Sequence, residues 1–156
     1  CQGLAANQIL SLQGILNGTC NFILTGMTDQ GRSYAEVLAE AQRKGYAEAD
    51  PTLDVDGTDA AHKLAILVQI AFGIAVPLSA IRRRGIADID QLDIRFAKEL
   101  GYTIKLLAEA WLEPGVRDQG SGVRGQGSEE DQIALQVSPV MLRQTTPLAL
   151  VRDAYN

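Results

Sequence analysis

The segment from residue 45 to residue 63, GYAEADPTLDVDGTDAAHK, places acidic side chains and one lysine next to apolar sequence. A lysine among carboxylates can act as a general acid and base when its surroundings ease the loss of its proton. The same carboxylates suit a ligand that carries an ammonium group, such as an amino acid. The segment therefore predicts a site for chemistry on a small polar ligand. Its charged residues are Glu48, Asp50, Asp54, Asp56, Asp59 and Lys63.

A helix is expected to position the lysine. Apolar residues recur at helical spacing from about Gly57 to about Phe72 and predict a long, largely buried helix, with Asp56 as a candidate N-cap. Asp59 and Lys63 are four residues apart, so they share a helical face and can pair. Because the helix behind Lys63 is apolar, we expect this lysine to be partly desolvated, which eases proton loss. The alternative is an exposed salt bridge worth on the order of a few tenths of a kcal/mol.

Three stretches carry a longer pattern: GILNGTCNFILTGM at 14–27, EAQRKGYAEADPTLDVDGTDAAHKLAIL at 40–67 and RRGIADID at 83–90. They closely resemble the substrate-binding, catalytic domain of homoserine dehydrogenase. The resemblance covers nearly the whole chain, and its GYxEaDP turn followed by an acidic helix start and a lysine is long and specific. It implies that residues 1–156 are that catalytic domain, without the family's nucleotide-binding domain.

The resemblance implies a role for each matching residue. Glu48, Asp54 and Asp59 would hold the amino group and side-chain hydroxyl of homoserine. Lys63 matches the catalytic lysine, which relays a proton at the terminal oxygen of the substrate, and Asp59 belongs to the same catalytic set. Further substrate contacts would come from Gly18, Thr19, Gly45 and Tyr46, of which Gly18 and Thr19 are also candidates for contacts near the nicotinamide.

The implied activity is the NAD(P)-dependent interconversion of L-homoserine and L-aspartate 4-semialdehyde, in the pathway to threonine, methionine and isoleucine. NAD or NADP would bind mainly to the nucleotide-binding domain, so this chain alone is expected to be inactive. Two alternatives stay open: a non-catalytic module that binds an amino acid, and a module whose main role is dimerisation. The lysine at its spacing favours the enzyme, because a pocket without catalysis has no need of it.

Residues 120–125, GSGVRG, fit the dinucleotide fingerprint G-x-G-x-x-G. A true fingerprint follows a buried strand and opens a helix. This one lies in a glycine-rich polar run at about 114–132, which predicts a mobile loop that joins two strands.

The pattern of the whole chain predicts an α+β fold, with one mixed or antiparallel sheet and a layer of helices on one face. The strand at 102–112 alternates like a half-buried strand, so the opposite face of the sheet is available for dimerisation, and the resemblance implies a homodimer. The expected strands are 9–16, 77–81, 102–112 and 133–142, and the expected helices are 19–27, 34–44, 57–72 and 90–100.

Composition excludes several classes of protein. A hydrophobic content of 46% argues against disorder, and a net charge of −5 argues against nucleic acid as a partner. The run from Arg82 to Arg84 is expected to be a solvated corner.

His62, the only histidine, should point away from the face that carries Lys63, and one histidine without paired cysteines predicts no metal site. Two cysteines without a secretory signal or membrane span predict a cytoplasmic protein.

Overall fold

The computed structural model describes residues 9–113, 123–124, 132–152 and 154. Most of the GSGVRG motif and of the expected loop at 114–132 lies outside the described residues; within it, Val123 and Arg124 form a short strand. The elements follow in the order β1 (Ser11–Gly14), α1 (Gly18–Gln30), α2 (Tyr34–Arg43), α3 (Thr52–Val55), α4 (Thr58–Phe72), η2 (Leu78–Ala80), β2 (Arg82–Arg83), α5 (Gln91–Glu99), β3 (Tyr102–Glu113), β4 (Val123–Arg124), β5 (Gln132–Arg143) and η3 (Pro147–Leu150).

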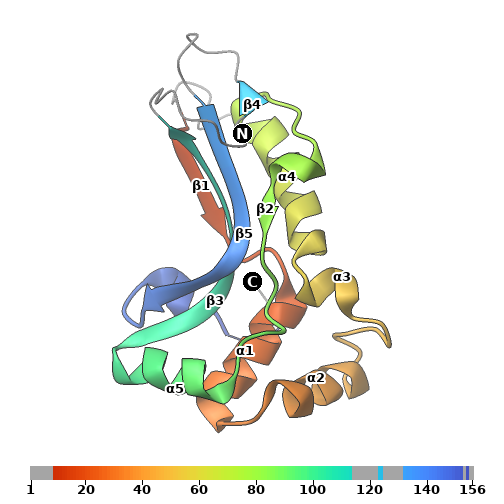
Figure 1. The fold of residues 1–156 in the computed structure, drawn as a ribbon, viewed down its shortest axis with the longest axis vertical. Coiled ribbons are helices and arrows are strands. Elements are labelled where there is room, and N and C mark those ends of the chain that lie inside the picture. The colour runs from red at the N-terminus through yellow and green to blue at the C-terminus, as the bar shows by residue number, and fades with distance from the viewer. Residues whose placement is uncertain (1–8, 114–122, 125–131, 153, 155–156) are drawn as a thin grey trace.

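The strands form one mixed sheet in the order β1-β3-β5-β2, with β4 also paired to β5. Its centre is the antiparallel pair β3 and β5, in register from Tyr102 opposite Arg143 to Glu113 opposite Gln132. The short strand β2 runs parallel to β5. Figure 1 shows α4 alongside β5 and β2, with α1, α2 and α5 gathered at the lower end of the long strands. The predicted α+β fold with a mixed sheet is therefore confirmed.

Burial along the two long strands differs from the prediction in one respect. Residues alternate between buried and half-buried along the first part of β5, but every residue of β3 from Thr103 to Ala110 is buried. The strand predicted at 102–112 is confirmed, but its predicted half-burial is wrong. The reason is position, because β3 lies between β1 and β5 and contacts α1, α4, α5 and η3.

Most helices begin and end close to the predicted residues, because the sequence supplies capping side chains at their ends. Ser33 and Glu36 form a capping box at the start of α2, and Asp90 caps α5 through the backbone N–H groups of Leu92 and Asp93. The strand predicted at 77–81 is wrong. Pro77 precedes the 3-10 turn η2, and the strand β2 follows it. Arg82 and Arg83, expected in a solvated corner, are exposed but belong to this strand.

Helix α4 carries the lysine of interest. Its N-cap is Gly57, in the left-handed region at φ 85°, while the carboxylate of Asp56 accepts a hydrogen bond of 2.8 Å from Thr58 N. The expected N-cap at Asp56 is therefore one residue early. The helix is also less buried than predicted, since Ile66 is 59% and Ile70 64% exposed. Only one face is covered, through Ala60, Ala61, Leu64 and Val68.

The junction between α3 and α4 is held against the segment that follows β2. Ile86 N donates to Val55 O over 2.8 Å, and a β-carbon at Gly85 would lie 2.1 Å from that same carbonyl oxygen. Only glycine permits this close approach. The contact fixes the turn that separates Asp54 from α4. None of the helices in the described part of the chain has the length and apolar character needed to span a membrane.

Candidate functional site

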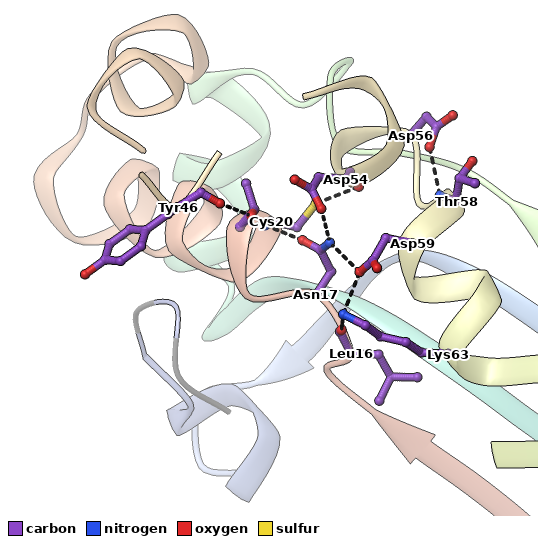
Figure 2. Close-up of polar contacts among 10 residues, drawn as sticks. Leu16, Asn17, Cys20, Tyr46, Asp54, Asp56, Thr58, Asp59 and Lys63 are labelled. Carbon is purple, nitrogen blue, oxygen red and sulfur yellow. Dashed lines mark hydrogen bonds and ion pairs between the residues drawn. The ribbon is translucent and has the colours of Figure 1, made fainter. Parts of the chain in front are cut away.

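The start of α1, the helix α3 and the first turn of α4 meet at Asn17 (Figure 2). This residue is buried, with 3% of its surface exposed. Its Oδ1 accepts a hydrogen bond from Cys20 N over 2.7 Å and so caps α1. Its Nδ2 donates to Asp54 Oδ1 over 2.7 Å and to Asp59 Oδ2 over 2.9 Å. One amide therefore fixes the distance between two carboxylates that come from separate elements.

Lys63 completes this cluster. Its Nζ donates to Asp59 Oδ2 over 2.7 Å and to the carbonyl oxygen of Leu16 over 3.0 Å (Figure 2). The ammonium has three donors, so one has no acceptor among the described residues. The Lys63 side chain is 51% exposed and that of Asp59 32%, so the lysine is covered over only about half of its surface. Lys63 lies at the edge of the buried face of α4, where a ligand can reach it.

The two carboxylates also keep free acceptors. Both described contacts of Asp59 fall on Oδ2, and the described contact of the Asp54 carboxylate falls on Oδ1. Asp54 Oδ2 and Asp59 Oδ1 therefore have no hydrogen-bond donor within the described ranges. Partly buried carboxylate oxygens without donors are suited to an ammonium or hydroxyl group of a ligand.

These groups line a cavity of about 340 Å³. This size suits a small molecule, and the charged groups of Asp54, Asp59 and Lys63 in the lining suit a polar one. The structure brings together six of the residues that the sequence predicted for the site, while Glu48 and Gly45 do not line the cavity. The lining consists of Asn17, Gly18, Thr19, Tyr46, Asp54, Asp59, Lys63 and Ala154.

The wall at Tyr46 is tied to α1. Thr19 Oγ1 donates to the carbonyl oxygen of Tyr46 over 2.7 Å, and the ring of Tyr46 meets that of Phe22 edge to face at 5.1 Å between centroids. These contacts fix the backbone of the turn that follows α2. Further along this turn, Glu48 is exposed, and its carbonyl oxygen accepts from Gln42 Nε2 over 3.1 Å.

Asn17 and Ala154 are site residues that the sequence prediction missed. An asparagine directly before Gly-Thr at a helix start is an N-cap signal, which indicates its role toward α1 but not its bridge to Asp54 and Asp59. No sequence pattern around Ala154 indicates a role in the site, because this residue is far along the chain from the other residues that line the cavity.

Cys20, also missed, is fully buried beneath the cluster and its Sγ donates to the carbonyl oxygen of Asp54 over 3.2 Å. Burial raises the pKa of the Cys20 thiol well above its ordinary value, and the negative charges of Asp54, Asp59 and Asp56 add to this shift. The thiol therefore stays protonated near neutral pH and cannot act as a nucleophile. Within the described ranges, no group of His, Cys, Asp or Glu side chains is arranged to hold a metal ion, and His62 does not line the cavity.

The fold and the cavity define a class of site, in which a lysine paired to a carboxylate faces a small polar cavity on an α+β scaffold. The whole chain, residues 1–156, matches the family described as homoserine dehydrogenase. Homoserine dehydrogenase of Neisseria gonorrhoeae is 44% identical over 155 residues, which are 99% of this chain and 32% of that protein. The chain belongs to the homoserine dehydrogenase family.

Solved structures agree with this assignment. A homoserine dehydrogenase from Thiobacillus denitrificans matches with a TM-score of 0.83 and 46% identity, over 98% of this chain and 32% of that one. A hyperthermophilic archaeal homoserine dehydrogenase mutant in complex with NADPH matches with a TM-score of 0.67 and 25% identity, over 97% of this chain and 37% of that one. The chain thus spans about a third of the length of its relatives.

The family uses NAD(P), but the described residues do not form a dinucleotide-binding fold. Such folds are built from parallel strands joined through helices, with a glycine-rich turn at a helix start. In the described part of the chain the only parallel pairing is that of β2 with β5, which involves two residues of each strand. The described residues therefore lack the arrangement of strands and helices that a dinucleotide-binding fold requires.

Proposed function

We propose that this chain is the homoserine-binding, lysine-bearing part of an NAD(P)-dependent dehydrogenase that interconverts L-homoserine and L-aspartate 4-semialdehyde, on the way to threonine, methionine and isoleucine. The observation that carries this proposal is the Lys63 ammonium, held 2.7 Å from Asp59 at a cavity that Asp54 also lines. The nucleotide binds mainly to polypeptide outside the described residues. Gly18 and Thr19, at the cavity wall, are the candidates for contact near the nicotinamide.

The substrate lies with its ammonium group against the free oxygens of the carboxylate pair. Gly18 and Thr19 are the first residues of α1, whose backbone N–H groups have no acceptor inside the helix. These donors, together with the positive end of the helix dipole, suit the carboxylate of an amino acid. This orientation leaves the side-chain hydroxyl of homoserine free to reach Lys63.

Lys63 then moves the proton. In the oxidation of homoserine its amine form accepts the hydroxyl proton, and in the reverse direction its ammonium donates a proton to the aldehyde oxygen. Asp59 holds Nζ in place through a charge-assisted hydrogen bond of 2.7 Å. Bound NAD(P) supplies or accepts the hydride.

The role of Glu48 is a proposal that rests on the family resemblance, since its side chain is exposed and does not line the cavity. We expect Glu48→Ala to raise the KM for homoserine about tenfold and to spare kcat, because a carboxylate that only holds the amino group contributes uniform binding. The measurement is steady-state oxidation of L-homoserine by an active dehydrogenase that contains this chain. The matched control is Glu99→Ala, which removes an exposed acid at the end of α5. An unchanged KM would mean that Glu48 remains in solvent.

We also propose a homodimer that forms through the sheet. The support is apolar surface beside β5, where Phe96 is 50%, Leu100 69% and Met141 46% exposed around one cleft. Contiguous exposed apolar surface commonly marks an interface. Multi-angle light scattering of the enzyme should give the mass of two copies, which Met141→Lys should shift toward one. A monomer mass for the unchanged protein would contradict this assembly.

A further inference from the structure

Lys105, the fourth residue of β3, is fully buried, with 0% of the residue exposed. Its Nζ donates to Asn21 Oδ1 over 2.7 Å, to Thr25 Oγ1 over 3.3 Å and to the carbonyl oxygen of Val151 over 2.6 Å. Asn21 and Thr25 are one turn apart on the same face of α1. The ammonium thus joins three parts of the chain: the central strand, the first helix and the segment after η3.

A buried ammonium is expensive, because removal from water costs several kcal/mol per ion unless polar partners replace the water. Here each of its three donors has an acceptor, which is what makes the burial tolerable. An apolar residue would fill the same space in a core of leucine and isoleucine at lower cost. The contacts indicate that this lysine does something that an apolar residue could not do, which is to bind the backbone of the C-terminal segment.

The C-terminal segment lies along α1 toward the cavity. Arg152 Nη1 bonds both carboxylate oxygens of Asp29, at 2.7 and 2.8 Å, near the end of the helix. Ala154 lines the cavity at the start of the helix. A β-carbon at Gly18 would lie 2.4 Å from the carbonyl oxygen of Ala154, so the two backbones are in close contact.

We propose that Lys105 is a positioning residue for the homoserine pocket: it anchors the backbone at Val151 and thereby places Ala154, which lines the cavity next to Gly18. This inference rests on the proposed function, because it assigns the substrate of that same pocket. Lys105 contacts the side of α1 that faces the sheet, through Asn21. It does not itself line the cavity. The close approach of Ala154 to Gly18 sets the width of the pocket at the end where the substrate carboxylate binds.

The test uses an active dehydrogenase that contains this chain, with Lys105→Met as the main variant and Lys98→Met as the matched control on the exposed face of α5. Lys105→Met should raise the KM for homoserine about tenfold or more and lower kcat much less, since a displaced wall weakens positioning. It should also speed hydrogen–deuterium exchange in peptides that cover residues 148–154. Lys98→Met should change neither quantity.

Thr25→Val is the second variant, because it removes one acceptor without unpairing the ammonium completely. Thr25→Val should raise the KM for homoserine and speed hydrogen–deuterium exchange at residues 148–154, both by smaller factors than Lys105→Met. If Lys105→Met does not fold, Thr25→Val alone tests whether the anchor positions the pocket. A folded variant with a lower melting temperature but unchanged KM and unchanged exchange at 148–154 would overturn the inference. If the unchanged enzyme does not turn over homoserine, the proposed function fails, while the exchange comparison still tests the anchor.

Discussion

Replacing Lys63 with alanine should lower kcat for homoserine oxidation by roughly 10²–10⁴-fold, the range that general acid–base catalysis contributes. The KM should change little, because the carboxylates and the start of α1 hold the substrate in this account. The physical reason is the position of Nζ, which is fixed by Asp59 and Leu16 O and keeps one donor for the oxygen that gains or loses a proton. Steady-state and single-turnover kinetics with NAD(P) measure both quantities.

The chain offers a closely matched control in Lys44. This residue pairs with Glu40 at the same four-residue spacing and the same 2.7 Å, and its side chain is 49% exposed against 51% for Lys63. It does not line the cavity. Lys44→Ala should therefore leave kcat near that of the unchanged enzyme. Near-normal turnover in Lys63→Ala would remove the lysine from the mechanism and leave the 59–63 pair as a plain helix salt bridge.

The second large effect is expected at Asn17, which joins two carboxylates and caps α1. Asn17→Asp keeps a capping oxygen but replaces the two amide donors with a third negative charge beside Asp54 and Asp59. We expect kcat/KM for homoserine to fall by about 10- to 100-fold, because the two carboxylates lose the group that fixes their positions. The free energy of unfolding should fall by about 1–3 kcal/mol from the lost hydrogen bonds.

Asn17→Ser separates the two causes. Serine caps a helix well and carries no charge, so this variant loses the bridge without adding repulsion. The kcat/KM of Asn17→Ser should lie between that of the unchanged enzyme and that of Asn17→Asp. Steady-state kinetics and denaturant unfolding of both variants measure these effects. Wild-type kcat/KM in Asn17→Asp would show that the spacing of Asp54 and Asp59 does not matter to the reaction.

The parts of the fold that rest on local chemistry could be predicted from the sequence. The capping box at Ser33 and the cap at Asp90 set helix boundaries through contacts within a few residues. The pairing of Asp59 with Lys63 follows from their spacing alone. The long strands at β3 and β5 follow from their apolar and β-branched residues.

The parts that depend on distant segments could not be predicted in this way. The continuous burial of β3 from Thr103 to Ala110 follows from its place in the sheet, which its own pattern does not encode. The short strand β2 forms only through its parallel pairing with β5, which is distant in the sequence. The bridge made by Asn17 and the cavity wall at Ala154 require segments that are 37 or more residues away. Glu48 was assigned by resemblance, and the local contacts of its turn leave it in solvent here.

The most direct test of the central claim is a crystal structure of an active dehydrogenase that contains this chain, with L-homoserine and nucleotide bound. The account predicts the side-chain hydroxyl of homoserine about 3 Å from Lys63 Nζ, within hydrogen-bond reach. It also predicts the ammonium group of the substrate against Asp54 or Asp59. Homoserine bound away from this cavity, or with its hydroxyl turned from a lysine that contacts only Asp59 and Leu16, would contradict the account.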